Sequence, residues 1–446
     1  MSGLLRIVEG ARAGREQVLR RDPARVFDPA LPEAVRVSIR ETFGADLTAS
    51  QVVARIVADV RREGDAAVTR YSQRFDRSAY RAIEVTREEI DAAFEQVPGE
   101  LLEALEVAAN RVHDHHERQA AHGPRDFTYG GTGMIVRPLQ RVGIYMTGSD
   151  TVLPSTVIHT AVPARVAEVE QILGVTAARA DGSVHPLKLV AAEIAGVHRI
   201  FRASGAQAIA ALAFGTETIP RVDKVCGPGN VFVTLAKQQL YGVVGIDGLY
   251  GPTETLVIAD DSADPRLCAA DLLAQAEHDA LATPVLITLS RAHAEAVAAE
   301  VELQLAGLER AEIARAAVAR GGAIVAASLD EAMELANEFA PEHLCLLTER
   351  PEELVELVRN AGGVFVGKHS PEVLGDYVAG PSHVMPTGGS ARFASPLTVF
   401  DFLKVISTIE LPRERLFEIG PAAAALARTE GLTAHARSIE LRLEAR

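Results

Sequence analysis

Short apolar runs alternate with helical stretches along most of this chain, and the alternation limits its fold more than any other feature. A first series of apolar runs covers residues 142–145, 171–175, 199–202, 222–225 and 243–246. A second series covers residues 256–258, 285–288, 323–325, 343–347 and 364–366. Strands that alternate with helices form βαβ units and a largely parallel sheet. We therefore expect an α/β protein with two successive, incomplete Rossmann-like parallel-sheet halves.

Two flanking regions depart from this pattern. Residues 1–135 indicate a helical lead, because apolar residues in segments such as 49–63 recur at helical spacing. The first half then covers 136–247, the second covers 248–388, and residues 389–446 form a small helical tail. The tail is too small to form a core alone, so we expect it to pack on the body or on a second subunit.

Composition excludes several classes of partner. The 446 residues carry a formal net charge of −15, and 48% are hydrophobic. Phosphate binding needs a basic face, so neither nucleic acid nor an anionic membrane is an expected partner. We find no signal peptide and no run of ~20 apolar residues, and we expect a cytoplasmic protein. The three cysteines form no C-x-x-C pair, which argues against disulfides and a thiolate zinc site.

The stretch 264–278 is typical of one helix that ends in two potential metal ligands. Asp264 is a good N-cap and Pro265 suits the first helical position. Gln275 and His278 share a stripe with Asp271, and zinc accepts such oxygen and nitrogen donors. A Gln and a His at this spacing are also common surface or cap residues.

Distant residues could complete such a site. Asp376 and His435 lie among glycines and prolines and have suitable side chains, although no spacing requires them to meet these two. His113 and His116 also share a helix face. Their stretch is strongly charged, so we interpret it as a solvated surface.

Two loops follow strands of the first half, where a parallel sheet presents backbone N–H groups to phosphate. One is the glycine-rich turn Cys226-Gly-Pro-Gly-Asn230, and the other is Tyr145-Met-Thr-Gly-Ser149. Together they predict a cleft at the carboxyl ends of the strands, although the first could also be only a tight turn. Cys226 suggests covalent aldehyde oxidation, but we find no base near it and favour a buried structural thiol.

Glu342 and His343 stand side by side where a strand begins. Both side chains can do acid–base chemistry near neutral pH. Neighbours on a regular strand face opposite ways, so joint action requires a loop, which Pro341 favours. The pair precedes its strand, whereas parallel sheets usually bind ligands at the carboxyl edge, so we expect the site at an interface of halves or subunits. A capping Glu and an edge His are the simpler alternative.

Seven stretches together resemble the histidinol dehydrogenase family, in the order in which the family has them. They are Ser204-Gly-Ala-Gln-Ala-Ile-Ala-Ala-Leu-Ala-Phe-Gly-Thr216, Val222-Asp-Lys-Val-Cys-Gly-Pro-Gly-Asn230, Asp271-Leu-Leu-Ala-Gln-Ala-Glu-His278, Pro341-Glu-His-Leu344, Gly375-Asp-Tyr377, His383-Val-Met-Pro-Thr387 and Leu432-Thr-Ala-His435. The likeness covers the chain from about residue 140 to its end.

The resemblance implies an enzyme that oxidises L-histidinol to L-histidine through histidinal, with NAD and one zinc ion per subunit, in the last steps of histidine biosynthesis. It implies a homodimer whose tail contributes to the partner's site. The implied zinc ligands are Gln275, His278, Asp376 and His435. In the family such zinc holds the substrate's imidazole and amine in an octahedral arrangement, so these ligands, together with His343, also match positions that contact substrate.

The resemblance also implies roles for other residues. His343 would take the alcohol proton, and Glu342 would activate water on the aldehyde. Tyr145, Gln207 and Asn230 match cofactor-binding positions. Thr253, His383 and Glu430 match substrate-binding positions.

Four positions depart from the family pattern without removing a ligand or a catalytic group. They are the loop Met146-Thr-Gly-Ser149, Thr253 in place of serine, Pro381-Ser382 in place of Thr-Asn, and Asp279-Ala280, which lacks a proline. They leave room for a paralogue that oxidises another polar alcohol, such as a sulfonated diol. A non-catalytic two-lobed binding protein is a third possibility, which the Glu342–His343 pair argues against.

Overall fold

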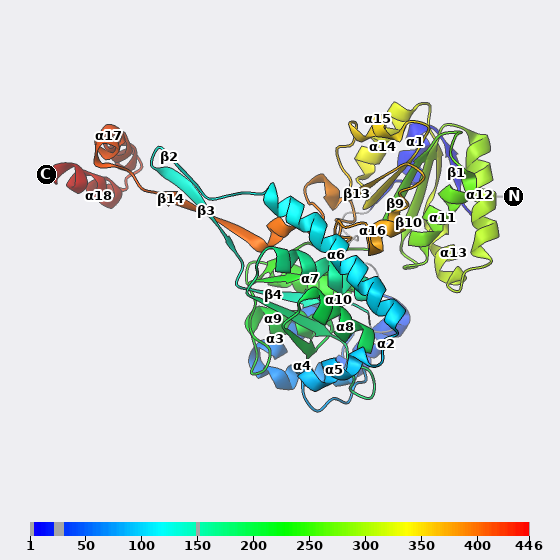
Figure 1. The fold of residues 1–446 in the computed structure, drawn as a ribbon, viewed down its shortest axis with the longest axis horizontal. Coiled ribbons are helices and arrows are strands. Elements are labelled where there is room, and N and C mark those ends of the chain that lie inside the picture. Colours follow the sequence, from blue (N-terminus) through cyan, green and yellow to red (C-terminus); the bar gives the residue numbers. More distant parts are fainter. Residues whose placement is uncertain (1–3, 22–30, 149–151, 446) are drawn as a thin grey trace.

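The computed structural model describes residues 4–21, 31–148 and 152–445. Two bodies, each built on one parallel sheet, lie next to each other, and a slender arm leads away from them to the C-terminus (Figure 1). This architecture confirms the predicted fold class of two parallel-sheet halves with a helical lead and a helical tail. The division at residues 135, 247 and 388 stays a prediction.

The first sheet has five strands in the order β6-β5-β4-β7-β8, and all neighbouring pairs are parallel. The strands are β4 (Arg141–Tyr145), β5 (Gln171–Thr176), β6 (Arg199–Arg202), β7 (Lys224–Cys226) and β8 (Gly245–Ile246). Its helices are α7 (Pro154–Val166), α8 (Pro186–Ala195), α9 (Gly205–Phe214) and α10 (Val231–Leu240). The strand order reverses between β4 and β7, so the loops that follow them part and leave a crevice at the carboxyl edge.

The second sheet has six parallel strands in the order β1-β11-β10-β9-β12-β13. They are β1 (Ile7–Glu9), β9 (Glu254–Ala259), β10 (Thr283–Thr288), β11 (Gly322–Val325), β12 (His343–Leu347) and β13 (Gly363–Val366). Its helices are α11 (Pro265–Ala276), α12 (Arg291–Leu305), α13 (Ala311–Arg320), α14 (Leu329–Phe339), α15 (Pro351–Val355) and α16 (Glu372–Tyr377). Here the order reverses between β9 and β12, whose first residues lie next to each other.

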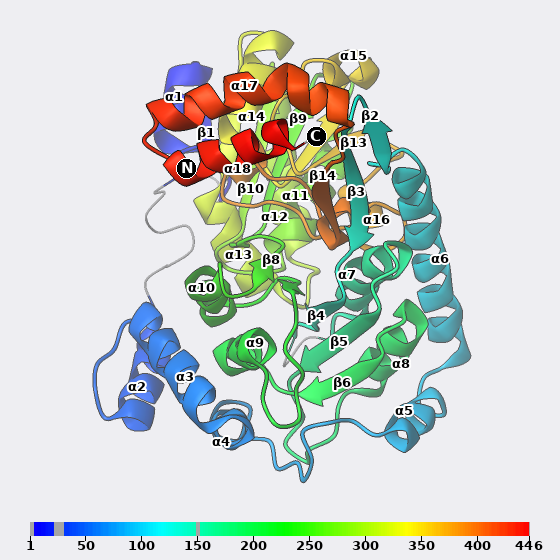
Figure 2. The same cartoon turned by 90° about the vertical axis from the view of Figure 1, so that its left-hand side faces the viewer.

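Both sheets are buried on two faces, which explains why their strands are continuous apolar runs. In β5, Ile172 belongs to the core under α7 and α8, whereas Leu173 belongs to the core under α9 and α10. Figure 2 shows these helix pairs on opposite sides of the first sheet. Two further clusters cover the faces of the second sheet. Each fully buried Ile or Leu contributes ~1.5–3 kcal/mol to folding.

The N-terminal lead is mainly helical in its described residues. Its helices are α1 (Gly10–Gln17), α2 (Glu33–Phe43), α3 (Ala49–Glu63), α4 (Asp65–Phe75), α5 (Arg87–Phe94) and α6 (Gly99–Ala121). The capping box of Thr48 and Gln51 starts α3 as the sequence pattern indicates. The prediction missed β1, which pairs with β11 of the second sheet. Three residues directly before a helix are too few to show a strand period.

A third, antiparallel sheet links the body to the arm. It consists of β2 (Phe127–Tyr129), β3 (Thr132–Pro138) and β14 (Leu403–Ile409), in the order β14-β3-β2. The sequence analysis did not predict these strands. They are largely exposed, so no buried alternation marks them. Short 3₁₀ turns at Ser390–Arg392 and Val399–Phe402 precede β14.

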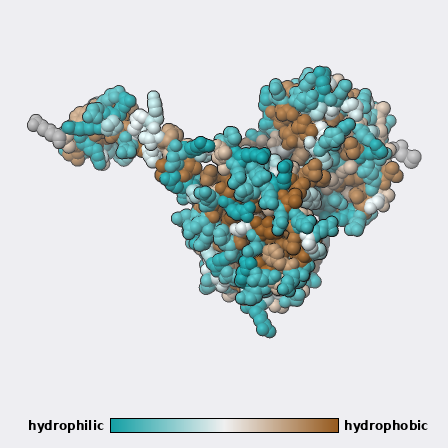
Figure 3. All heavy atoms as spheres, viewed as in Figure 1, coloured by the Kyte–Doolittle hydropathy of each residue, from teal (hydrophilic) through white to brown (hydrophobic). Residues whose placement is uncertain are grey.

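The tail consists of α17 (Arg413–Thr429) and α18 (Thr433–Glu444), which pack on each other. In the described parts of the chain, every hydrogen bond and ion pair of these helices stays within the tail. Several large apolar side chains of the arm are exposed: Val405, Ile406, Ile409, Phe417, Ile419, Leu426, Leu432 and Leu441. Figure 3 shows apolar side chains at the surface of this arm. No helix within residues 4–21, 31–148 or 152–445 is long and apolar enough to cross a membrane.

Candidate functional site

The predicted acid–base pair lies buried at the start of β12. Ala340 adopts a left-handed conformation with φ of 51°, and Pro341 follows, so the chain turns before the strand begins. Regular pairing of β12 with β9 starts only at His343. Glu342 therefore still belongs to the turn, and its side chain can lie on the same side as the His343 ring. His343 Nδ1 lies 3.7 Å from Glu342 Oε2 and 3.3 Å from the Glu254 carbonyl oxygen. The pair therefore lies at the amino edge of the second sheet, as the unusual sequence position indicates.

Neighbouring groups set the protonation of this pair. Glu342 Oε2 accepts hydrogen bonds from Thr253 Oγ1 at 2.6 Å and from the Glu254 N–H at 3.2 Å. Burial raises the pKa of Glu342. Burial lowers the pKa of His343, but the carboxylates around it outweigh this and raise the pKa to about 10. His343 Nε2 is a buried nitrogen without a hydrogen-bond partner in the described residues, 3.8 Å from Asp376 Oδ1.

Two of the four predicted metal ligands, Gln275 and Asp376, contact each other near this pair, and a third, His278, lies close to Asp376. Gln275 is buried at the end of α11, and its Nε2 donates to Asp376 Oδ2 at 3.1 Å. Gln275 Oε1 lies 2.9 Å from Thr253 Oγ1. Asp376, on α16, also lies close enough to His278 for the imidazole to act on its charge. Burial raises the pKa of Asp376, but His343, His383 and His278 outweigh it and hold the pKa at about 2.

The helical stretch that was predicted to carry both ligands ends earlier than expected. Asp264 caps α11 as predicted, by accepting from the Arg266 N–H. The helix ends at Ala276, because the His278 amide bonds to the Gln275 carbonyl oxygen, three residues back in place of four. His278 is therefore an exposed turn residue, while Gln275 is helical. Asp271 is buried one turn before Gln275, and burial raises its pKa to about 6.

Two predicted site residues lie elsewhere in the single chain. Glu430 and His435 are exposed beside and on the helices α17 and α18, which make no hydrogen bond to the body in the described residues. His383, by contrast, joins the site. Its Nδ1 donates to the Asp376 carbonyl oxygen at 2.8 Å.

The three predicted cofactor residues line one cavity of about 840 Å³ at the carboxyl edge of the first sheet. Tyr145 and Asn230 follow β4 and β7, the strands at which the order reverses, and Gln207 lies on α9. The Asn230 side chain caps α10, and the Gly205 N–H donates to the Tyr145 hydroxyl oxygen at 3.0 Å. The Nε2 of Gln207 is buried without a hydrogen-bond partner in the described residues. The predicted loop also includes Ser149, which lies outside the described residues.

The glycine-rich turn and Cys226 have structural roles. Gly227 has φ of 106°, and a Cβ atom there would lie 2.8 Å from the Tyr145 carbonyl oxygen, so only glycine allows the two loops to approach so closely. Cys226 is fully buried, and burial raises the pKa of its thiol well above the usual value. This agrees with the favoured interpretation of a structural thiol.

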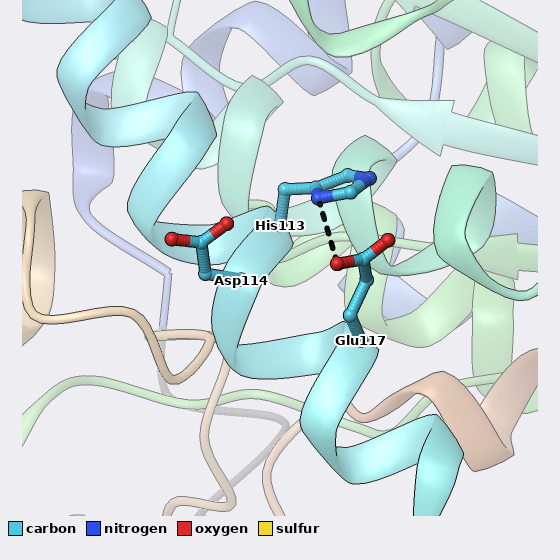
Figure 4. Close-up of side chains that lie close together, drawn as sticks. All are labelled: His113, Asp114 and Glu117. Carbon is cyan, nitrogen blue, oxygen red and sulfur yellow. Dashed lines mark ion pairs between the residues drawn. The ribbon is translucent and has the colours of Figure 1, made fainter.

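In the described residues, His113, Asp114 and Glu117 make no hydrogen bond or ion pair to this site. His113, Asp114 and Glu117 gather on α6, and Nδ1 of His113 lies 3.8 Å from Glu117 Oε2 (Figure 4). The two acidic side chains are exposed. His116 is buried instead, and its Nδ1 bonds to the Val112 carbonyl oxygen. The expected solvated surface is confirmed for Asp114 and Glu117 and is wrong for His116, which packs inward.

Sequence reasoning missed four buried groups around the site. Arg21 pairs with Glu254 at the start of β9, Glu372 bonds to Thr255 behind His343, and His159 bonds to the segment that follows Asp376. None of the four belongs to a motif or a spacing pattern that the sequence analysis singled out. The only available signal was a polar residue within an apolar run at His159.

The model of the histidinol dehydrogenase family matches residues 40–443. The chain belongs to the histidinol dehydrogenase family. It is 53% identical to histidinol dehydrogenase of Deinococcus radiodurans over 418 residues, which cover 93% of this chain and 95% of the relative. It is 44% identical to the enzyme of that name from Dehalococcoides mccartyi, over 99% of this chain and 100% of the relative.

A solved structure extends the likeness to three dimensions. The crystal structure of histidinol dehydrogenase from Elizabethkingia anophelis aligns with a TM-score of 0.88 at 32% identity, over 100% of this chain and 99% of that one. Membership of the histidinol dehydrogenase family confirms the resemblance predicted from the seven sequence stretches.

Proposed function

We propose that this member of the histidinol dehydrogenase family oxidises L-histidinol through L-histidinal to L-histidine, with two molecules of NAD as hydride acceptors. Family membership over residues 40–443 supports this reaction as part of histidine biosynthesis. In the structure, one observation carries it. The buried Glu342–His343 pair lies beside Gln275 and Asp376, so acid–base groups and metal-binding groups share one site. The reported relatives give no support to a paralogue for another alcohol.

The first oxidation needs a base for the alcohol proton. A His343 ring that donates from Nδ1 to the Glu254 carbonyl keeps a lone pair on Nε2, which has no partner in the described residues. His343 then takes the hydroxyl proton at Nε2 while the carbinol carbon transfers its hydride to NAD. The carboxylate of Asp376 contributes to the raised pKa of His343. A metal ion held by Asp376 would offset that negative charge and oppose the rise, which would favour the neutral ring that the first step needs.

The second oxidation adds one water molecule to the aldehyde. Glu342 accepts a proton from that water as the oxygen bonds to the carbonyl carbon, and a second hydride then leaves to NAD. The hydrogen bonds from Thr253 and the Glu254 amide fix the carboxylate in place for this step. The product is a carboxylate, so the two steps together consume two NAD and one water.

The donor set supports zinc as the metal. Gln275, His278 and Asp376 supply an amide, an imidazole and a carboxylate, which are oxygen and nitrogen donors that zinc accepts. His435 of a second chain is the proposed fourth ligand, so each subunit binds one zinc. Zinc, when bound, supplies positive charge that holds the imidazole and the amine of the substrate. Thr253, His383 and Glu430 are proposed to contact the substrate beside it.

The cavity at the first sheet supports NAD as the cofactor. It lies where the strand order reverses, which is where such sheets bind dinucleotides. The unpaired Nε2 of Gln207 offers a hydrogen-bond donor to a ligand there. Tyr145 keeps its proton because burial raises its pKa to about 12, so the hydroxyl group can also donate.

A homodimer accounts for the arm. The tail helices bury few of their own residues and expose Phe417, Leu426 and Leu441. A second copy of the chain would cover these side chains and receive Glu430 and His435 at its site.

The test is the number of NADH molecules formed per molecule of L-histidinol, measured with and without a chelator. We expect two NADH, no activity after chelation, and recovery with zinc. The absence of turnover at saturating histidinol in zinc-loaded protein would contradict the proposal.

A further inference from the structure

The imidazole of His159 contacts both ends of the segment that carries Asp376 and His383. His159 lies on α7 of the first half and is fully buried. Its Nε2 lies 3.2 Å from the Tyr377 carbonyl oxygen, and its Nδ1 lies 3.2 Å from the backbone nitrogen of His383. One side chain of the first half therefore holds two points of a segment that belongs to the second.

Further contacts close this arrangement. The rings of His159 and His383 stack with centroids 4.4 Å apart and planes 7° from parallel. Ser382 Oγ donates to the His159 carbonyl oxygen at 2.9 Å and accepts from the Val384 N–H at 3.2 Å. Ser382 is one of the positions where the sequence departs from the family pattern. Here its hydroxyl group fastens the segment to α7.

We propose that His159 is a positioning residue that fixes the ring orientation and the tautomer of His383 for substrate binding. The inference rests on the proposed function, because it takes His383 to be a substrate contact. His159 itself touches no reacting atom. It acts through the backbone of Tyr377 and through the ring of His383.

The hydrogen bonds assign the protons. His159 Nδ1 receives the His383 N–H, so the proton of the His159 ring is on Nε2, where it faces the Tyr377 carbonyl. The ring is neutral, in keeping with burial, which lowers its pKa to about 3. His383 Nδ1 faces the Asp376 carbonyl and must donate. His383 Nε2 is then a lone-pair acceptor, and its ring cannot rotate while one face is stacked on His159.

This arrangement specifies what His383 can bind. A fixed acceptor nitrogen selects an N–H or O–H donor, which the amine, imidazole and hydroxyl groups of an amino alcohol provide. Simple packing does not require a histidine at position 159. Burial of a polar ring is unfavourable unless both nitrogens are bonded, and here both bonds go to the functional segment.

The test compares His159→Phe, which keeps a flat ring but loses both hydrogen bonds, with His159→Asn, which keeps an acceptor near the Nδ1 position. His293→Phe is the matched control, because His293 is a buried histidine on α12, beside Cys268. Steady-state kinetics give KM for histidinol and for NAD and kcat for each oxidation. Thermal unfolding reports on the fold.

We expect His159→Phe to raise KM for histidinol about tenfold or more while KM for NAD stays within about twofold, and His159→Asn to recover part of the loss. The control should leave both constants unchanged. An unchanged histidinol KM in His159→Phe, or an equal rise in the control, would overturn the inference. If the parent protein itself fails to oxidise histidinol, the proposed function fails instead.

A second measurement covers the case in which His159→Phe does not fold. The ring nitrogens of ¹⁵N-labelled histidine in the parent protein, assigned with His383→Gln, should show His383 protonated at Nδ1 only. In His159→Asn the signals should move toward a mixture of tautomers. A mixture in the parent, or no change in the Asn variant, would overturn the inference.

Discussion

Thr253 connects the acid–base pair to the metal-binding residues through one hydroxyl group. Its Oγ1 lies 2.6 Å from Glu342 Oε2 and 2.9 Å from Gln275 Oε1, but a hydroxyl has one proton to donate. The carboxylate is the stronger acceptor, so Gln275 Oε1 keeps its lone pairs for another partner. That is the state a metal ligand needs. The added methyl group, relative to the usual serine, does not disturb these contacts.

Removal of this hydroxyl group should impair catalysis. We expect Thr253→Val to lower kcat/KM for histidinol about tenfold or more, since Glu342 loses its shortest hydrogen bond. Thr253→Ser, which keeps the hydroxyl group, should stay within about twofold of the parent. Initial rates of NADH formation measure both. Equal rates for Val and Ser would show that the hydroxyl group is not used.

The two oxidations should respond differently to a change at Glu342. Glu342→Gln keeps the size of the side chain but cannot accept a proton from water, so we expect histidinal oxidation to slow about a hundredfold or more. Histidinol oxidation should slow less, because His343 serves that step. Rates with each substrate, measured separately, decide this. Equal slowing of both steps would refute the division of labour.

For single residues, the sequence predicts which side chains can take part in catalysis better than it predicts which side chains contact one another. Glu342 and His343 could be recognised because they are adjacent and follow Pro341. Gln275 and Asp376 could be joined only through family resemblance, since 101 positions separate them and no local period relates them. His159 gave only a weak signal, because it is one of several buried polar residues in the mostly apolar helix α7. Its partners lie more than 200 positions away.

Among the secondary-structure elements, the parallel strands were predictable and the peripheral strands were not. All ten strands predicted for the two halves correspond to β4–β13, because burial on both faces makes each of them a distinct apolar run. β1, β2, β3 and β14 are short or exposed, so composition does not distinguish them. The end of α11 before His278 also depends on backbone contacts that spacing does not show.

The segment after α1 is fastened to the second sheet by a buried ion pair. Arg21 Nε and Nη2 lie 2.7 Å and 2.6 Å from the two carboxylate oxygens of Glu254, and the guanidinium group covers the Phe339 ring at 3.6 Å. Burial raises the pKa of Glu254 to about 7, although Arg21 acts to lower it. The Glu254 backbone in turn contacts both Glu342 and His343. This ion pair therefore helps to hold in place the backbone that contacts the acid–base pair.

Loss of Arg21 should destabilise the fold more at high pH. The pKa of Glu254 in the folded protein is above its ordinary value of 4.5. The contribution of protonated Glu254 to stability is therefore complete below pH 4.5 and is lost as the pH rises through about 7. Arg21→Met leaves the charge unpaired, and we expect a loss of ~3 kcal/mol at pH 8 but a smaller loss at pH 5. Urea unfolding at both pH values measures it.

A second substitution is the control for this prediction. Glu254→Gln in the Arg21→Met chain removes the unpaired charge, so it should recover most of the stability at pH 8. A loss that is equal at pH 5 and pH 8, or that the second substitution leaves unchanged, would show that packing against Phe339 matters more than charge.

In the whole molecule, the arm separates two proposed site residues from the rest. β14 and β3 pair over seven residues, from Leu403 with Pro138 to Ile409 with Thr132, and carry the tail helices away from both sheets (Figure 1). Glu430 and His435 belong to this tail and are therefore also held away from both sheets. The two-body core holds Gln275, His278 and Asp376, so the proposed ligand set spans two chains.

Hybrid dimers test this exchange. In a mixture of His278→Ala and His435→Ala chains, each hybrid has one site with both histidines intact and one site with neither. Statistical exchange should restore about a quarter of the parent activity from two inactive proteins. Native mass spectrometry confirms that the subunits have exchanged. If verified hybrids remain inactive, His435 acts in its own chain.

The isolated position of the arm has a consequence for how activity arises in time. Under the proposed function, a newly folded chain has its acid–base pair and its cofactor cavity but lacks the fourth metal ligand, and it exposes Ile409 and Leu426. Formation of the proposed homodimer would complete both metal sites and cover these side chains at the same time. The onset of catalysis is then second order in protein, and slow pairing leaves aggregation-prone surface exposed for longer. The rate of synthesis, as well as the amount made, determines how much of the protein becomes enzyme.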